Sequence, residues 1–143
     1  MLMIIFSSCT EKKTNQKEIF INDLISKMTV MEKIGQLNQY SSFFDVTGPR
    51  PTSSKDSIKY EQIKRGLVGS VLNVTGVKDV KAMQALAIEK SRLKIPLIFG
   101  LDVIHGYKTI SPIPIAESAS WNLDLIEKSA RIAAKEAASA GIN

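Results

Sequence analysis

The stretch IPLIFGLDVIHGYKTISP, residues 95–112, decides the fold that the sequence predicts. Pro96 keeps Ile95 out of the helical region, and the apolar run that ends at Leu101 is too short to cross a membrane. We therefore expect a buried parallel strand here, with Asp102 at its carboxyl end. Its apolar side chains are Leu97, Ile98, Phe99 and Leu101. In parallel α/β folds ligands bind where loops leave the strands, so Asp102 is the first candidate site residue.

A second strand is expected before this one, at residues 69–73, because GSVLN is short and rich in β-branched residues. Between the two strands, residues 77–93 have a helical apolar stripe made of Val80, Met83, Leu86, Ala87 and Leu93. Strand, helix and strand in this order form a βαβ unit, which implies a parallel sheet and an α/β fold class. Asn73, at the end of the earlier strand, either faces a ligand or caps the turn that follows.

Two helices in tandem are expected near the N-terminus. Apolar residues at helical spacing predict the first helix, which ends near Lys27: Ile21, Leu24, Ile25 and Met28. Thr29 and Glu32 have the spacing of a capping box and open the second helix. Residues 41–57, rich in Gly, Pro and Ser, predict a loop, and a weak helix through Tyr60 and Ile63 follows.

The last third of the chain predicts a short helix at residues 114–118 and a long one at 123–140. Asn122 suits the N-cap of the long helix and Gly141 its C-cap. Trp121 precedes this cap, where we expect it to pack in the core rather than stack on a ligand. A third strand of the repeat would begin at the end of the chain, so we interpret the sequence as part of a longer architecture.

Composition bounds the possible functions. The 143 residues are 44% hydrophobic and 23% charged, as in a folded globular protein. The net charge of +5 is scattered without a block of basic and aromatic residues, so no nucleic-acid partner is expected. Neither a Cys/His cluster for a metal nor a glycine-rich phosphate loop is present, and we expect no cofactor.

The N-terminus resembles the end of a bacterial lipoprotein signal. Residues 1–9 run from an apolar stretch through Ser7 and Ser8 to Cys9, which would be the lipidated residue. Residues 10–17 would then be a polar tether, and the folded domain would span 18–143. The alternatives are a misassigned start or an apolar N-terminus without lipid. The signal predicts the periplasm or cell envelope, with membrane attachment only through Cys9.

Three segments together resemble family 3 of the glycoside hydrolases, in its periplasmic β-glucosidase branch. They are LISKMTVMEKIGQLNQ (residues 24–39), GSVLNV (69–74) and the stretch from Ile95 to Asn143. The resemblance runs from about Ile19 to the last residue. It implies the N-terminal portion of a (β/α)8 TIM-type barrel, incomplete in this chain, which an α/β sandwich domain follows in whole enzymes of the family.

The resemblance also implies the chemistry. The family hydrolyses terminal β-linked glucosyl residues with retention, using one carboxyl group as nucleophile and another as acid/base. Asp102 matches its substrate-binding Asp, whereas neither catalytic carboxyl group has a counterpart in these residues. The chain alone is therefore expected to be inactive. His105 either contacts the sugar or holds the loop by a backbone hydrogen bond, and Gly106 supplies a turn.

A protein of another class remains possible at this point. A lipoprotein that binds glycans without cleaving them would use Asp102 together with the loop at residues 48–57. Both hypotheses share one partner, a β-glucoside or an oligosaccharide. They differ in whether that partner is hydrolysed.

Overall fold

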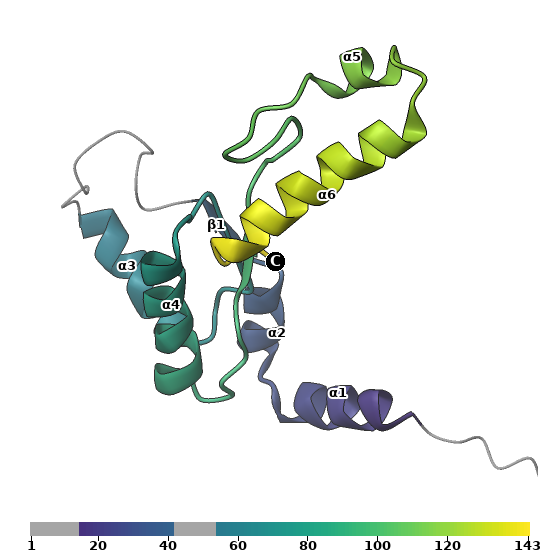
Figure 1. The fold of residues 1–143 in the computed structure, drawn as a ribbon. Coiled ribbons are helices and arrows are strands. Elements are labelled where there is room, and N and C mark those ends of the chain that lie inside the picture. Colours follow the sequence, from purple (N-terminus) through teal and green to yellow (C-terminus); the bar gives the residue numbers. More distant parts are fainter. Residues whose placement is uncertain (1–14, 42–53) are drawn as a thin grey trace, which may run out of the picture.

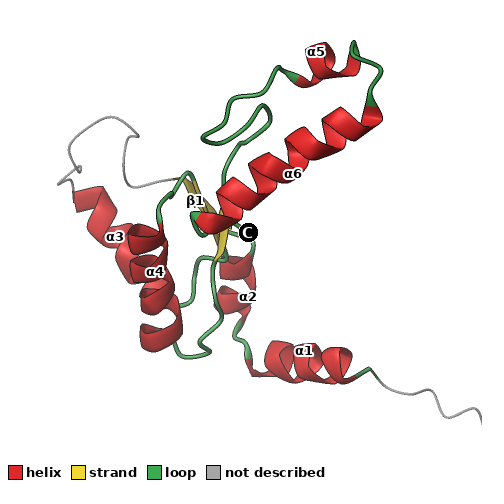
Figure 2. Ribbon diagram, in the orientation of Figure 1, coloured by secondary structure: helices red, strands yellow, loops and turns green. Residues whose placement is uncertain are grey.

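The computed structural model describes residues 15–41 and 54–143. Within these residues a small parallel sheet has the order β1-β2-β3, formed by β1 (Gln39–Ser41), β2 (Ser70–Leu72) and β3 (Ile98–Gly100). Helix α3 (Ser54–Lys64) connects β1 to β2, and α4 (Val77–Ala85) lies between β2 and β3 (Figure 1; Figure 2). The predicted α/β class and the βαβ unit are confirmed. Cys9 and the proposed signal segment lie outside the described residues.

The middle residues of the strands form one row that faces the helices. Tyr40 pairs with Val71, which pairs with Phe99. Val71 is fully buried and Phe99 is 1% exposed. The core around them consists of Ile63, Val68, Val74, Val80, Met83, Ala87 and Leu97. Ile98 is 62% exposed, so the expectation that it is buried was wrong: side chains alternate along a strand, and Ile98 lies on the opposite face from Phe99.

Strand β1 and the start of α3 correct the prediction of a loop over residues 41–57. The strand ends at Ser41, the helix begins at Ser54, and residues 42–53 lie outside the described part. The sequence analysis missed β1 because Gln39-Tyr40-Ser41 contains a single apolar side chain, too few for a hydrophobic pattern. Its parallel pairing with β2 instead defines the strand.

The N-terminal helices are α1 (Gln16–Lys27) and α2 (Val30–Gln36). Helix α1 begins inside the segment expected to be a tether, because the Asn15 side chain accepts a hydrogen bond from the Lys17 N–H and caps it. The capping box of α2 is confirmed: the Glu32 N–H donates to Thr29 Oγ1, and the Thr29 N–H donates to Glu32 Oε2. None of the residues of α1 is buried.

An ion pair between the exposed Arg92 and the buried Glu32 connects α2 to the segment that follows α4. Arg92 donates from Nε to Glu32 Oε1 (3.1 Å) and from a terminal nitrogen to Glu32 Oε2 (2.6 Å). The same guanidinium donates to the Lys27 carbonyl at the end of α1 (2.8 Å). Glu32 is 7% exposed, and the hydrogen bonds from Arg92 and Thr29 lower the pKa of its carboxyl group to about 2.

Helix α2 also lies directly against the turn that leads into β2. A Cβ atom on Gly35 would lie 2.4 Å from the Leu67 Cα, and one on Gly69 would lie 2.1 Å from the Gln36 carbonyl oxygen. Both distances are far below van der Waals contact. Only glycine therefore permits this close approach of the two backbones.

The helix predicted at residues 77–93 ends earlier than expected. It widens after Ala85 into a π-helical turn, η1 (Leu86–Lys90), and stops at Ser91. The buried Ser91 hydroxyl donates to the Ala87 carbonyl (2.5 Å) and accepts from the Lys94 N–H (3.1 Å). These local side-chain bonds compete with continuation of the helix and turn the chain towards β3.

The last two helices are α5 (Pro114–Ser118) and α6 (Leu123–Ser139). Both predicted caps of α6 are confirmed: Asn122 Oδ1 accepts from the Leu125 N–H, and Gly141 follows the helix at φ 91°. Two residues in the C-terminal half of α6, Ala133 and Ala137, are buried, and so is its C-cap residue, Ala140. Asn143 then pairs with β3, donating its N–H to the Phe99 carbonyl and accepting the Phe99 N–H on Oδ1.

The expectation that Trp121 packs in the core was wrong. Its side chain is 91% exposed instead of packed in the core. It lies in the connection between α5 and α6, a part of the chain that extends away from the sheet (Figure 1). In the described ranges, no helix has the length and apolar character needed to cross a membrane.

The Glu32 carboxylate makes stability sensitive to acid. Its pKa is lowered in the folded protein. The ionised carboxylate therefore contributes fully to the free energy of unfolding above about pH 4.5, and this contribution is lost as the pH falls towards 2. We expect Glu32→Gln to lower the free energy of unfolding at pH 7 by on the order of 2 kcal/mol and to flatten its dependence on pH in this window. Urea unfolding at a series of pH values measures both effects.

The matched control is Glu61→Gln, because Glu61 pairs with Lys64 on an exposed helix surface. It should change the unfolding free energy by less than about 0.5 kcal/mol. Equal effects of the two substitutions would contradict the role assigned to Glu32.

Candidate functional site

The carboxyl ends of the parallel strands bring three polar residues to one edge of the sheet. Ser41 ends β1, Asn73 follows β2, and Asp102 follows β3 by two residues. Asn73 Nδ2 donates to Ser41 Oγ (3.4 Å), and the Asn73 N–H donates to the Gly100 carbonyl (2.9 Å). Asn73 itself has φ 65°, a left-handed conformation that Asn tolerates better than most residues. Its side chain therefore ties two strand ends together, and no hydrogen bond to the following turn is formed among the described residues.

Asp102 lies exposed at this edge, as predicted. Its Oδ1 accepts the Ile104 N–H (3.1 Å), which holds the carboxylate against the start of its own turn. Within the part of the chain that the structure describes, Oδ2 accepts no hydrogen bond. A carboxylate has about four acceptor positions, so most of the capacity of Asp102 is available to a ligand.

The turn after Asp102 presents His105. The Gly106 N–H donates to the Val103 carbonyl (3.0 Å), and Gly106 has φ 104°. A Cβ atom there would lie 2.0 Å from the Thr109 carbonyl oxygen, so the predicted role of Gly106 in a turn is confirmed. The backbone carbonyl of His105 accepts the Ser111 N–H (2.8 Å), whereas its exposed ring forms no hydrogen bond with any residue of the described ranges. The backbone, rather than the imidazole, closes the loop.

Glu136 on α6 binds the tip of the same loop. Its Oε2 accepts the N–H groups of Lys108 and Thr109, both at 2.9 Å, and its Oε1 accepts the Thr109 hydroxyl at 2.7 Å. These hydrogen bonds, those from Thr109 foremost, lower the pKa of the Glu136 carboxyl group. The sequence analysis did not single out this residue, because a Glu in a long helix carries no signal of a contact 27 residues away.

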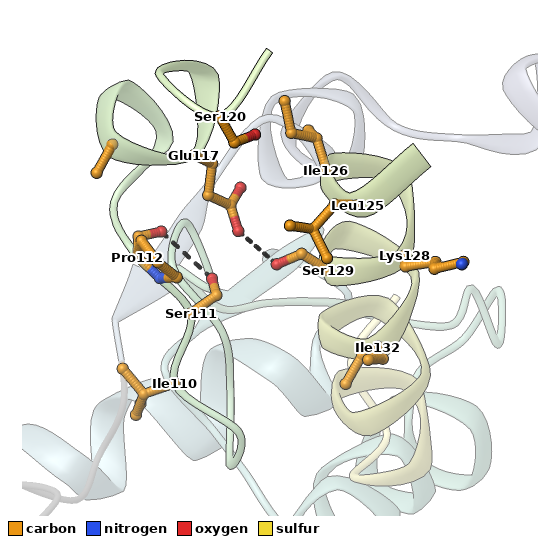
Figure 3. A pocket seen from close by; sticks show the side chains of 11 residues that line it. Ile110, Ser111, Pro112, Glu117, Ser120, Leu125, Ile126, Lys128, Ser129 and Ile132 are labelled. Carbon is orange, nitrogen blue, oxygen red and sulfur yellow. Dashed lines mark hydrogen bonds between the residues drawn. The ribbon is translucent and has the colours of Figure 1, made fainter. Parts of the chain in front are cut away.

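An apolar groove lies beside this loop, between α5 and α6 (Figure 3). Its volume is about 470 Å³, and its lining includes Pro112, Leu125, Ile126 and Ile132. Glu117 is the carboxylate of this lining, and its Oε1 accepts the Ser129 hydroxyl at 2.5 Å. Neither Asp102 nor His105 lines the groove. This groove and the polar edge of the sheet are therefore different places.

The exposed side chains at the sheet edge, those of Asp102 and His105, are hydrogen-bonding groups. A carboxylate with open acceptor positions and a histidine three residues later offer acceptors and a donor to a polyhydroxylated ligand. Among residues 15–41 and 54–143, no group of three His, Cys, Asp or Glu side chains gathers in a way that could hold a metal ion.

The chain is similar to known proteins in sequence and in fold. The family described as "Glycosyl hydrolase family 3 N terminal domain" matches residues 29–143. The chain is 42% identical over 127 residues to the periplasmic beta-glucosidase of Salmonella typhimurium, and 29% identical over 161 aligned positions to the lysosomal beta glucosidase of Dictyostelium discoideum. A crystal structure of a mutant beta-glucosidase from Listeria innocua in complex with laminaribiose superposes with a TM-score of 0.74 at 31% identity.

The relatives are much longer than this chain. The alignments cover 89% and 92% of the chain but only 16% of the Salmonella protein and 20% of the Dictyostelium protein. The superposition covers 91% of the chain and 18% of the Listeria protein. The similarity therefore concerns one portion of each relative.

The ionisation of Glu136 is directly measurable. In a pH titration followed by NMR, the amide resonances of Lys108 and Thr109 should report a midpoint below 4.5, the ordinary value for Glu, because their hydrogen bonds favour the charged carboxylate. A midpoint at or above 4.5 at Lys108 and Thr109 would contradict the contact.

Proposed function

Because the chain belongs to the glycosyl hydrolase family 3, as an N-terminal domain of that family, we propose that it forms the terminal-sugar-binding edge of a β-glucosidase. The observation that carries the proposal is the position of Asp102. This carboxylate lies exposed at the carboxyl end of β3, with Oδ1 bound to its own turn and Oδ2 open. Hydrogen bonds from sugar hydroxyls to a charged acceptor are stronger than those to a neutral one.

We propose further that β1, β2 and β3 are the first strands of a (β/α)8 barrel. Parallel strands in sequential order with intervening helices support this architecture. The helices cover one face of the sheet, and the exposed Ile98 lies on the other, which corresponds to the interior of a barrel. A barrel of this type takes about 250 residues, and ligands bind at the carboxyl ends of its strands.

In this proposal the chain binds and orients the sugar, and other residues perform the hydrolysis. Retaining glycosidases require two carboxyl groups about 5 Å apart, one as nucleophile and one as acid/base. Asp102 matches neither of them, and no residue of the chain is assigned either role. The imidazole of His105 supplies a second contact to the sugar, since its ring is not used to hold the loop.

The names of the relatives support a cellular location and a class for the protein. The Salmonella relative is named as a periplasmic enzyme, which supports the periplasm for this chain. A lipid anchor at Cys9 remains a proposal that rests on residues 1–9 alone. The alternative of a glycan-binding lipoprotein without activity gains no support from these relatives, which are named as beta-glucosidases.

Asp102→Asn tests the proposed contact. The substitution keeps an oxygen to accept the Ile104 N–H, so the turn is retained, but it removes the charge. We expect the dissociation constant for laminaribiose, measured by NMR titration of the chain, to rise by about 10- to 100-fold, the cost of losing a hydrogen bond to a charged group.

Asp124→Asn is the matched control, because Asp124 is an exposed carboxylate in the first turn of α6. It should leave the dissociation constant unchanged. Binding that is equally strong in Asp102→Asn and in the unaltered chain would contradict the proposal.

The assignment of sugar binding to this chain and of hydrolysis to other residues gives a second prediction. The 143-residue chain, incubated with an aryl β-glucoside, should release no aglycone, because binding residues without a nucleophile and an acid/base do not break the glycosidic bond. Absorbance of the released phenol measures this. Turnover that disappears in Asp102→Ala would show that the chain contains the catalytic groups itself.

A further inference from the structure

The loop that carries His105 is closed at its base by its own backbone. The bonds from Gly106 to Val103 and from Ser111 to His105 hold the two ends of the turn together. They leave the N–H groups of Lys108 and Thr109, at the tip, without a partner in the loop itself. An exposed tip of this kind would move independently of the strand edge.

Glu136 supplies the missing acceptors from outside the loop. Its two carboxylate oxygens receive three donors, the N–H groups of Lys108 and Thr109 and the hydroxyl of Thr109, at 2.7–2.9 Å. Bonds to an ionised acceptor are about twice as strong as neutral ones. Glu136 therefore joins the loop tip to α6, and no other side-chain hydrogen bond within the described ranges connects these two segments at this point.

The backbone under Glu136 is itself fixed. Its neighbours Ala133 and Ala137 on α6 are buried. The helix ends at Ser139, and a Cβ atom on Gly141, two residues later, would lie 2.8 Å from Val80 Cγ1, so the chain that leaves α6 lies directly on α4. The position of the loop tip is therefore set by a helix that is anchored on the sheet.

Another carboxylate of α6, that of Glu127, has a different environment. Glu127 pairs with Arg131 on the same helix, four residues away, and both side chains are more than 60% exposed. Such a pair connects nothing beyond its own helix. Glu136, in contrast, connects α6 to the loop at Lys108 and Thr109 and forms no such pair within its own helix.

We propose that Glu136 is a positioning residue for the sugar site: by holding Lys108 and Thr109 on α6, it fixes the turn that presents His105 beside Asp102. The inference rests on the proposed function, since it concerns the same strand edge. It goes beyond that function because the residue that fixes the His105 turn lies on α6 and not at the carboxyl edge of the sheet.

The test compares Glu136→Ala with Glu127→Ala in the 143-residue chain. Alanine suits both helical positions, and circular dichroism verifies that each variant is folded. In Glu136→Ala we expect hydrogen exchange at Lys108 and Thr109 to accelerate by about tenfold. We also expect the dissociation constant for laminaribiose to rise by about fivefold, because the His105 turn loses its fixed position. Glu127→Ala should change neither quantity.

A conservative variant separates positioning from general stability. Glu136→Gln keeps one carbonyl oxygen, which can accept from the loop tip, so it should restore part of the affinity for laminaribiose. Faster exchange with unchanged affinity would overturn the positioning role and leave the sugar site intact. If the unaltered chain binds no laminaribiose, the proposed function fails, and the positioning role fails with it even where exchange at the tip accelerates.

Discussion

The parallel pairing of β2 with β1 and β3 is the constraint on which the rest of the structure depends. The shared register buries Val71 and Phe99 in one row against the helices and, at the same time, brings the carboxyl ends of all three strands to one edge. Asn73 and Asp102 reach the same region for this reason alone. The core and the candidate site are therefore two consequences of one set of backbone hydrogen bonds.

Local signals in the sequence predicted the parts of the fold that depend on local chemistry. The capping box at Thr29, the caps of α6 and the strands β2 and β3 all follow from short patterns, and the structure confirms them. The place of Asp102 at a strand end was predictable in the same way, because an apolar run that stops at a polar residue marks the edge of a sheet. Its role as a sugar-binding residue, like that of His105, stays a prediction.

The features that the sequence did not reveal depend on partners distant in the chain. Strand β1 has almost no apolar pattern and exists through its pairing with β2. The contacts from Arg92 to Glu32 and from Glu136 to Thr109 join residues 60 and 27 positions apart, and neither has a local signature. The prediction that Trp121 packs in the core was wrong for a related reason. Its residue type favours burial, but the segment with α5 and α6 extends away from the sheet.

The most direct test of the central claim is a map of the backbone amides whose NMR resonances shift when laminaribiose is added to the chain. A sugar held at the carboxyl edge of the sheet should shift the amides around Asn73 and from Leu101 to Gly106. It should leave those of α1 and of the groove between α5 and α6 unchanged. Shifts confined to that groove, or no shifts at the strand edge, would contradict the assignment of this edge as the site.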